Sequence, residues 1–324
     1  MKKLIMSGLI LATMGVTIIS CNKEKVEVES ETNTEIHKPD GLSIQDQKAK
    51  LVDNNDYSKL DLSKGVVEFK TIEYYKSIID AKDNENKIYF LSKYINESSF
   101  KSFGKINPTS QLFDDDFMEA ILDKNKIVKI GRWYVKINPE DESVFVSSSE
   151  NERAYDLVLN ETESNTNVYK FSTGDNILEF LSSQPTDERW SWWCSEDGVG
   201  SKHVSSGIMC IDNYCQNELH GEMHFRRFGI YYSLYLKVYK DNGSGYYMSM
   251  DLPKVYYHVK CGNTVGSYSV YGYGWETSNF RYQSYQGSTN LNEIWFKGRV
   301  KAQKWINGGW TYVNSGWLQI RVNV

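Results

Sequence analysis

The residues best suited to bind a metal ion lie in one short segment, His220-Gly221-Glu222-Met223-His224. In a β-strand alternate side chains point to the same side, so His220, Glu222 and His224 would share one face. Two imidazoles and one carboxylate can hold zinc or iron. The spacing differs from His-Glu-x-x-His, the helical motif of zinc proteases. The segment is compatible with a metal-dependent hydrolase or with a solvated strand face, and we favour the second interpretation.

Other catalytic signatures are absent from the sequence. It contains no Gly-x-Ser-x-Gly elbow, no phosphate-binding glycine loop and no dinucleotide fingerprint. No pair of carboxylates is marked by its spacing as an acid and a base. We therefore expect no cofactor and favour a non-enzymatic function.

A second set of candidate residues combines aromatic and basic side chains near the C-terminus. Residues 190–324 hold 23 of the 32 Trp and Tyr residues. Sugar rings stack their apolar faces on such side chains, and a basic surround suits an anionic glycan. The alternative is that the aromatic residues are buried beneath loops or the other domain. The candidate ligand-binding residues are Trp295, Trp305, Trp317, Tyr231 and Tyr235.

The segments that carry these aromatic residues have the period of β-strands. Apolar and polar residues alternate over 230–239, 255–261, 294–302 and 317–324, and glycine-rich turns lie at 241–245 and 307–309. Repeated strands of this kind predict an all-β sandwich-like domain.

The preceding region mixes helical and strand patterns. Helical spacing appears at 71–81, 87–94 and 114–123, and a hairpin is predicted from 126–137 and 143–146. We therefore expect an α+β domain. The three acids at Asp114, Asp115 and Asp116 suit the positive end of a helix dipole. A calcium site is the alternative, but the EF-hand spacing is absent.

The charge distribution also divides the chain in two. Residues 190–324 carry 13 Lys and Arg against 9 Asp and Glu, whereas 21–189 carry 22 against 33. We expect domains at 60–185 and 190–324, with the boundary near 182–187. The small positive charge of the second domain is weak for nucleic-acid binding, so no nucleic-acid partner is expected.

Four cysteines of the second domain predict a disulfide framework: Cys194, Cys210, Cys215 and Cys261. A turn at Asp212-Asn213 would place Cys210 opposite Cys215 in a hairpin. We favour that bridge, which leaves Cys194 with Cys261. Their spacings match no zinc motif.

The N-terminus has the features of an export signal. Lys2 and Lys3 precede an uncharged run over 4–19, which is short for a membrane-spanning helix. The run ends in Ile18-Ile19-Ser20-Cys21, which resembles the lipobox of bacterial lipoproteins, although that motif prefers Leu at the position of Ile18. The resemblance implies that residues 1–20 are cleaved and that Cys21 is lipidated. The alternative is an ordinary signal peptide with a chance cysteine.

The segment 21–59 is acidic and poor in aromatic residues, which is typical of a flexible tether. It is similar to the tethers of lipoproteins from Bacteroidetes-type bacteria, which implies anchoring to the outer membrane and exposure at the cell surface. The runs Phe113–Phe117, Ile130–Asn138 and Val144–Val146 resemble uncharacterised outer-membrane lipoproteins of the same group, over 60–185. That group implies no activity.

These observations predict a lipid-anchored envelope lipoprotein that binds a glycan or an envelope protein. The alternatives are the metal-dependent hydrolase and a structural subunit of an outer-membrane complex, with the acidic N-terminal domain as its docking surface.

Overall fold

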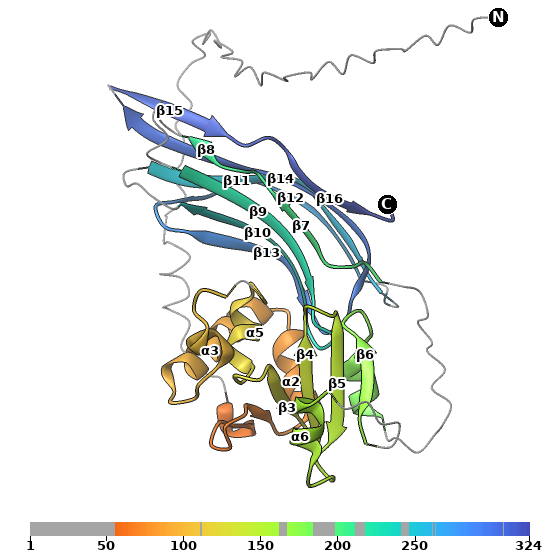
Figure 1. Ribbon diagram of the computed structural model, residues 1–324. Coiled ribbons are helices and arrows are strands. Elements are labelled where there is room, and N and C mark those ends of the chain that lie inside the picture. Colours follow the sequence, from red (N-terminus) through yellow and green to blue (C-terminus); the bar gives the residue numbers. More distant parts are fainter. Residues whose placement is uncertain are drawn as a thin grey trace, which may run out of the picture. The chain divides into compact units, whose positions relative to one another are not determined.

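Figure 1 shows a computed structural model of the chain. The structure describes residues 56–110, 112–161, 167–183, 198–210, 218–240, 246–260, 262, 264–306 and 308–324. Residues Leu51–Val324 form one compact unit. The described part is mostly β-structure in three sheets, which confirms the prediction of a largely β fold. None of the helices in this part combines the length and the apolar character needed to cross a membrane.

The first sheet has six strands in the order β1-β2-β3-β4-β5-β6. The pair β2–β3 is parallel and the other neighbours are antiparallel. The elements of this region are η1 (Tyr57–Lys59), β1 (Leu60–Asp61), β2 (Glu68–Phe69), α2 (Ile72–Ile79), α3 (Asn84–Glu97), α4 (Phe103–Ile106), α5 (Asp116–Ile121), β3 (Ile127–Ile130), β4 (Trp133–Asn138), β5 (Ser143–Ser148), α6 (Ala154–Leu159), β6 (Tyr169–Ser172) and α7 (Ile177–Ser182).

Both faces of this sheet are covered by helices. Val128 and Ile130 of β3 pack in a core with residues of α2, α3, α5 and α7. Ile127, on the opposite face, packs in a smaller core with Val158 of α6. The alternation of strand side chains thus supplies apolar residues to both sides, as in a layered α+β arrangement.

Helices α2, α3 and α5 lie where the sequence predicts helical segments, whereas α4 has no predicted counterpart and one predicted strand is wrong. Residues 126–137 form two strands rather than one, because the chain turns at Gly131 and Arg132 and pairs Ile130 with Trp133. Gly131 has φ +60°, a left-handed conformation that glycine adopts at low cost. The apolar residues change from even positions (Val128, Ile130) to odd positions (Trp133, Val135) across Gly131-Arg132, and this change of phase is the sequence signal for the turn.

The remaining strands form two five-stranded sheets. One has the order β13-β10-β9-β7, with β8 paired to β9, and the other has the order β12-β11-β14-β15, with β16 paired to β14. Their elements are β7 (Lys202–Ser205), β8 (Met209–Cys210), β9 (Glu218–Arg227), β10 (Tyr232–Lys240), β11 (Tyr246–Val259), β12 (Val265–Glu276), β13 (Phe280–Gly287), β14 (Leu291–Ile306), β15 (Gly309–Asn314) and β16 (Leu318–Val322). We call them the β9 sheet and the β14 sheet.

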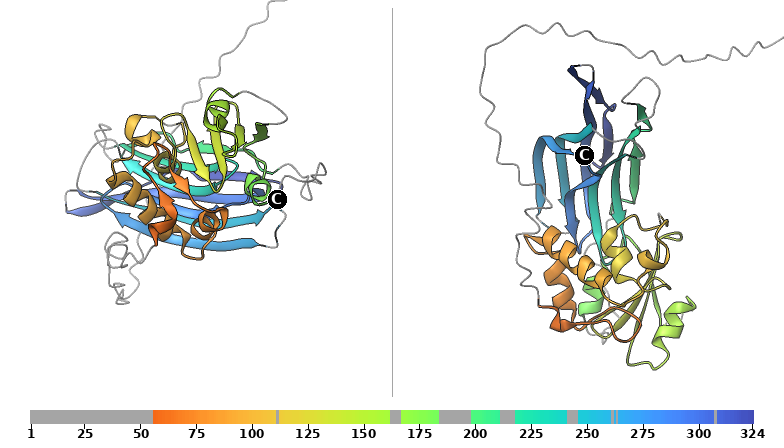
Figure 2. Two further views of the ribbon diagram at one scale, coloured as in Figure 1. Left: turned by 90° about the horizontal axis from the view of Figure 1, so that it is seen from below. Right: turned by 90° about the vertical axis from the view of Figure 1, so that its left-hand side faces the viewer.

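These two sheets share one apolar core. Leu234 and Leu236 of the β9 sheet pack in one cluster with Ile294, Phe296 and Val300 of the β14 sheet. The long curved strands of the two sheets lie beside each other in Figure 1 and in the right-hand view of Figure 2. Each sheet therefore turns one face toward this core and the other face away from it.

Residues of the two predicted domains also meet in a common core. Phe228, Ile230 and Tyr231 are buried in the same cluster as the helices of the first region. Tyr75 of α2 donates a hydrogen bond to the carbonyl oxygen of Ile230, at 3.2 Å. The division at 185–190 stays a prediction, and the described residues on its two sides pack together.

Candidate functional site: an aromatic and basic sheet face

The two faces of strand β14 differ in composition: one is apolar, and the other is aromatic and basic. Ile294 and Phe296 point inward and are fully buried. Trp295, Lys297 and Arg299 alternate with them and therefore point to the other side of the sheet. The neighbouring strands are in register with this pattern, since Trp295 pairs with Tyr256 of β11 and with Arg321 of β16.

We call this surface the aromatic–basic face. Its members come from β11, β12, β14, β15 and β16 and the residue that precedes β16: Tyr247, Lys254, Trp275, Trp295, Lys297, Arg299, Lys301, Trp305, Trp310, Trp317 and Arg321. Trp305 is 57% exposed and Trp317 is 48% exposed, while Trp295 is partly buried. The structure therefore places the three predicted tryptophans on one outward face rather than in a core.

Cations lie against the tryptophan rings of this face. Lys297 Nζ is 4.8 Å and Arg299 Cζ is 4.7 Å from the centroid of Trp317. Trp295 has the same arrangement, with Lys254 Nζ at 5.1 Å and Arg321 Cζ at 4.7 Å. Such cation–π contacts hold the rings in place and surround them with positive charge.

The end of the β14–β15 hairpin adds an aromatic cluster. Trp305 pairs with Trp310 across the strands, and their ring centroids are 5.4 Å apart. Tyr247 of β11 lies 6.0 Å from Trp310. Our sequence analysis missed Trp310, although its position after the Gly308-Gly309 turn, opposite Trp305, is the signal that could have identified it.

Positive charge dominates the aromatic–basic face. Asp251 binds Arg299 at 2.9 Å and Lys301 at 2.8 Å. Burial opposes the charge of Asp251, but the hydrogen bonds from Lys301, Gly272 and Arg299 hold its pKa below the ordinary value. Among the described residues no Asp or Glu forms an ion pair with Lys254, Lys297 or Arg321, but Arg321 Nη2 donates a hydrogen bond to the main-chain oxygen of Val324 at 3.2 Å. Lys254 and Lys297 are therefore the cations most available to an anionic ligand.

Two predicted ligand-binding residues lie elsewhere, and their predicted exposure is wrong. Tyr231 and Tyr235 are both fully buried. Tyr231 packs against Phe117 of α5 at 5.1 Å, and Tyr235 donates a hydrogen bond to the carbonyl oxygen of Asp114 at 2.6 Å. The loop before α5 and α5 itself cover this part of the β9 sheet, so these tyrosines are part of the packing between the two regions.

The histidine motif is also arranged differently from the prediction. Glu222 and His224 lie together on β9, but the second imidazole near them belongs to His203 of β7. His203 and His224 are cross-strand partners with ring centroids 4.4 Å apart. His220 instead stacks on Tyr239 at 4.8 Å. The sequence carries no signal for His203, because the pairing of β7 with β9 is non-local.

The electrostatics of this cluster keep His224 neutral. Burial and the guanidinium of Arg226 lower the pKa of His224 to about 4, against the opposing effect of Asp114 and Glu222. Burial opposes the charge of Glu222, but hydrogen bonds from Tyr239 and His224 hold its pKa below the ordinary value. At neutral pH the cluster therefore presents a neutral imidazole beside an ionised carboxylate.

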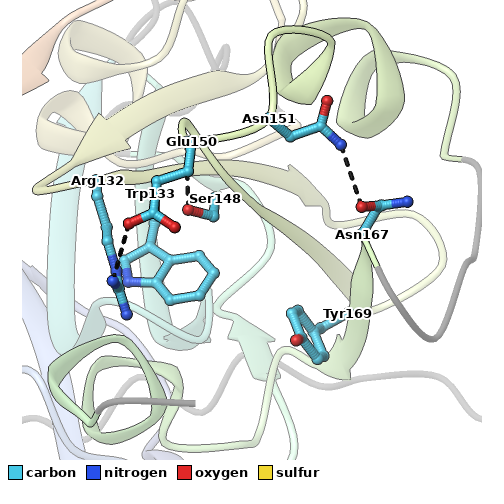
Figure 3. A pocket seen from close by; sticks show the side chains of 7 residues that line it. All are labelled: Arg132, Trp133, Ser148, Glu150, Asn151, Asn167 and Tyr169. Atoms are coloured by element: carbon cyan, nitrogen blue, oxygen red, sulfur yellow. Dashed lines mark hydrogen bonds and ion pairs between the residues drawn. The ribbon is translucent and has the colours of Figure 1, made fainter. Parts of the chain in front are cut away.

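Figure 3 shows a separate pocket on the first sheet, with a volume of about 460 Å³. Its lining residues are Arg132, Trp133, Ser148, Glu150, Asn151, Asn167 and Tyr169. Arg132 is neutralised by Glu150 at 3.2 Å, and the ring of Trp133 is only 1% exposed. The cation of this pocket is therefore paired and its indole is closed, which leaves the partly exposed Tyr169 as its accessible ring, and the pocket contains no predicted site residue.

Several predicted residues lie outside the described part of the chain, namely Cys21, Cys194, Cys215 and Cys261. Cys210, at the end of β8, is disulfide-bonded. The pairing of the four cysteines stays a prediction.

Comparison with known proteins adds no assignment. The chain matches no protein-family model, no curated protein and no solved structure. The resemblance to Bacteroidetes-type lipoproteins stays a prediction, and the function has to be inferred from the geometry of the aromatic–basic face.

Proposed function

We propose that this chain is a lipid-anchored, non-enzymatic envelope lipoprotein whose aromatic–basic face binds an anionic glycan. In this proposal an α+β domain is followed by a β-sandwich-like domain that carries the binding face. The observation that carries the proposal is the half-exposed ring of Trp317 beside Lys297 and Arg299.

The chemistry of a glycan fits this combination of side chains. The apolar face of a sugar ring stacks on an exposed indole, as other flat apolar groups do. Carboxylate or sulfate groups on the sugar would bind Lys297 or Lys254, which carry no ion pair with a described carboxylate. An arginine can bind such groups with two parallel hydrogen bonds, which suits Arg321.

The length of the face favours an extended ligand. Trp295 and Trp305 are ten residues apart on β14, and at 3.3 Å per residue this corresponds to about 33 Å. Aromatic rings are present at both ends and basic residues lie between them. A polymer that runs along β14 could contact both aromatic groups, whereas a single sugar could contact only one.

The test uses residues 22–324, which lack the predicted signal peptide and lipidation site, without a purification tag. Binding is measured against acidic polysaccharides, neutral polysaccharides, and vesicles of neutral lipid with or without anionic lipid. We expect binding to acidic polysaccharides that weakens as salt is added, because the cations contribute by charge. Failure to bind any polysaccharide, or binding to anionic vesicles alone, would contradict the glycan proposal. The face would then be a binding site for a protein or a membrane.

A further inference from the structure

A group of potential metal ligands lies on the β9 sheet, on the face that points away from the shared core. One nitrogen each from His203 and His224 and one carboxylate oxygen from Glu222 all lie within 4.8 Å of one another. His203 is exposed, Glu222 is partly exposed and His224 is buried. An ion could therefore enter from solvent at His203, and the buried side chain of His224 would hold it as a fixed ligand.

The distances agree with tetrahedral coordination. His224 Nε2 lies 3.2 Å from Glu222 Oε2. Two ligands at 2.0–2.2 Å from a tetrahedral zinc ion are about 3.4 Å apart, so this pair needs almost no movement. His203 has to approach by up to about 1.4 Å, and its ring, which stacks on that of His224, has to turn toward the ion. An exposed side chain on an edge strand can make both movements.

The backbone fixes two of the ligands relative to each other. His203 and His224 are direct partners in the antiparallel pair β7–β9. Side chains of direct partners leave the same face of the sheet with their Cβ atoms about 5 Å apart. Glu222 is two residues before His224 and therefore shares that face. The group results from strand pairing rather than from flexible surface side chains.

Neighbouring charges leave Glu222 available to an ion. The two nearby cations pair with Asp114, through Lys237 Nζ at 3.1 Å and Arg226 Nη2 at 3.5 Å. Tyr239 donates a hydrogen bond to Glu222 Oε1 at 2.8 Å, which holds the carboxylate and leaves Oε2 directed at His224. Hydrogen bonds of this kind orient the ligands of metal sites.

We propose that His203, Glu222 and His224 bind one divalent transition-metal ion of the zinc class, which links edge strand β7 to β9. Two imidazoles and one carboxylate are a ligand set that zinc accepts. Asp114 Oδ2 also lies 3.3 Å from His224 Nε2 and is the carboxylate oxygen next to this group. The site is independent of the aromatic–basic face, which belongs to the other sheet.

The test is a titration of untagged residues 22–324, which lack the predicted signal peptide and lipidation site, with Zn²⁺ by calorimetry and with Co²⁺ by visible absorption. We expect one ion per chain and the absorption spectrum of tetrahedral Co²⁺. The variant His203→Ala should weaken Zn²⁺ binding by about tenfold or more, and because His203 is exposed the variant should fold normally. Glu222→Gln should weaken binding in the same direction.

His220→Ala is the matched control, because His220 lies on the same strand and face but outside the group. It should change Zn²⁺ affinity less than about twofold. Zn²⁺ should also raise the unfolding temperature of the unmodified chain but not of His203→Ala, since a ligand of the folded state stabilises it. The absence of one-to-one binding, or equal loss in His203→Ala and His220→Ala, would overturn the proposal.

Discussion

Arg281 of β13 donates a hydrogen bond from Nη2 to Oδ2 of Asp115, at 3.0 Å. Asp115 is also the N-cap of α5, where its other oxygen accepts from the backbone N–H groups of Phe117 and Met118 at 3.1 Å. The carboxylate of Asp115 thus caps the N-terminus of α5 and also neutralises Arg281 in the β9 sheet. The side chain of Asp115 is fully buried, whereas that of Arg281 is 23% exposed.

Replacing this carboxylate should destabilise the protein. Asp115→Ala removes the helix cap and leaves the guanidinium of Arg281 without its partner. Caps contribute about 1 kcal/mol, and the broken ion pair adds to this, so we expect a loss of about 3 kcal/mol in the free energy of unfolding. Urea denaturation measures it. The exposed neighbour Asp116, changed to Ala, should cost less than about 0.5 kcal/mol. Equal losses of stability in Asp115→Ala and Asp116→Ala would mean that Asp115 does not hold α5 against the β9 sheet.

A glycine tests the packing between the β9 and β14 sheets. A Cβ atom at Gly221 of β9 would lie 2.6 Å from Cγ1 of Val300 in the facing sheet, which is too close. Gly221→Ala should therefore cost about 1–3 kcal/mol of stability by overpacking. Gly309→Ala is the control, because a Cβ atom there meets nothing within 4 Å. If both variants unfold at the same urea concentration as the parent, the two sheets are not packed as described.

The stability should depend on pH through Glu119 of α5. Burial, together with the charges of Asp116, Asp115 and Asp114, raises the pKa of Glu119 from 4.5 to about 7. At this group the folded state then binds a proton that the unfolded state has lost, so the contribution of Glu119 to stability falls as the pH rises from 4.5 to 7. The lowered pKa of His224 acts in the opposite direction over much of this range, so the effect of Glu119 has to be measured against a variant that lacks it. One pKa unit corresponds to about 1.4 kcal/mol, and partial exposure of the side chain reduces the total, so we expect a loss of about 1–2 kcal/mol.

Chemical denaturation of the parent and of Glu119→Gln across this pH range measures the effect. Glu119→Gln cannot ionise, so the stability of the parent relative to this variant should fall by about 1–2 kcal/mol between pH 4.5 and 7. Glu73→Gln changes an exposed glutamate of α2 and should leave the pH dependence of the parent in place. A difference between the parent and Glu119→Gln that stays constant or rises with pH would contradict the assignment.

Lipid anchoring can be tested in a bacterial host with the full chain. If Cys21 is the lipidation site, the protein should incorporate labelled palmitate and remain with membranes through a high-salt wash, because several acyl chains hold it there. Cys21→Ser should abolish the label and release the protein. Palmitate incorporation in Cys21→Ser would show that another residue is acylated, and no incorporation in the full chain would indicate an ordinary signal sequence.

Local patterns predicted much of the fold. The helical spacing over 71–81 and 114–123 corresponds to α2 and α5, and the alternation over 294–302 places Trp295 on the outward face of β14. In each case the information lies within one element, since a residue's neighbours at the helical or strand period determine which face it joins.

Residues whose surroundings come from distant segments could not be predicted in this way. Tyr231 and Tyr235 have the pattern of an outward strand face, but Asp114 and Phe117, more than a hundred residues earlier, cover them. His203 joins His224 only because β7 pairs with β9. Strand order and the packing of one layer on another depend on the whole chain. They cannot be inferred from the spacing of apolar residues within one segment.

The most direct test of the account is the affinity of Trp317→Ala for an acidic polysaccharide that the mature chain binds. Trp317 is 48% exposed, so truncation should spare the fold and remove the stacking surface. Tyr89→Ala is the control, because Tyr89 is an aromatic residue with 41% exposure on α3, in the first region of the chain. We predict at least about a tenfold loss of affinity for Trp317→Ala, from about 1.4 kcal/mol of stacking and cation–π energy, and no loss for Tyr89→Ala. Unchanged affinity of Trp317→Ala, or the same loss in both variants, would contradict the claim that the aromatic–basic face is the binding site.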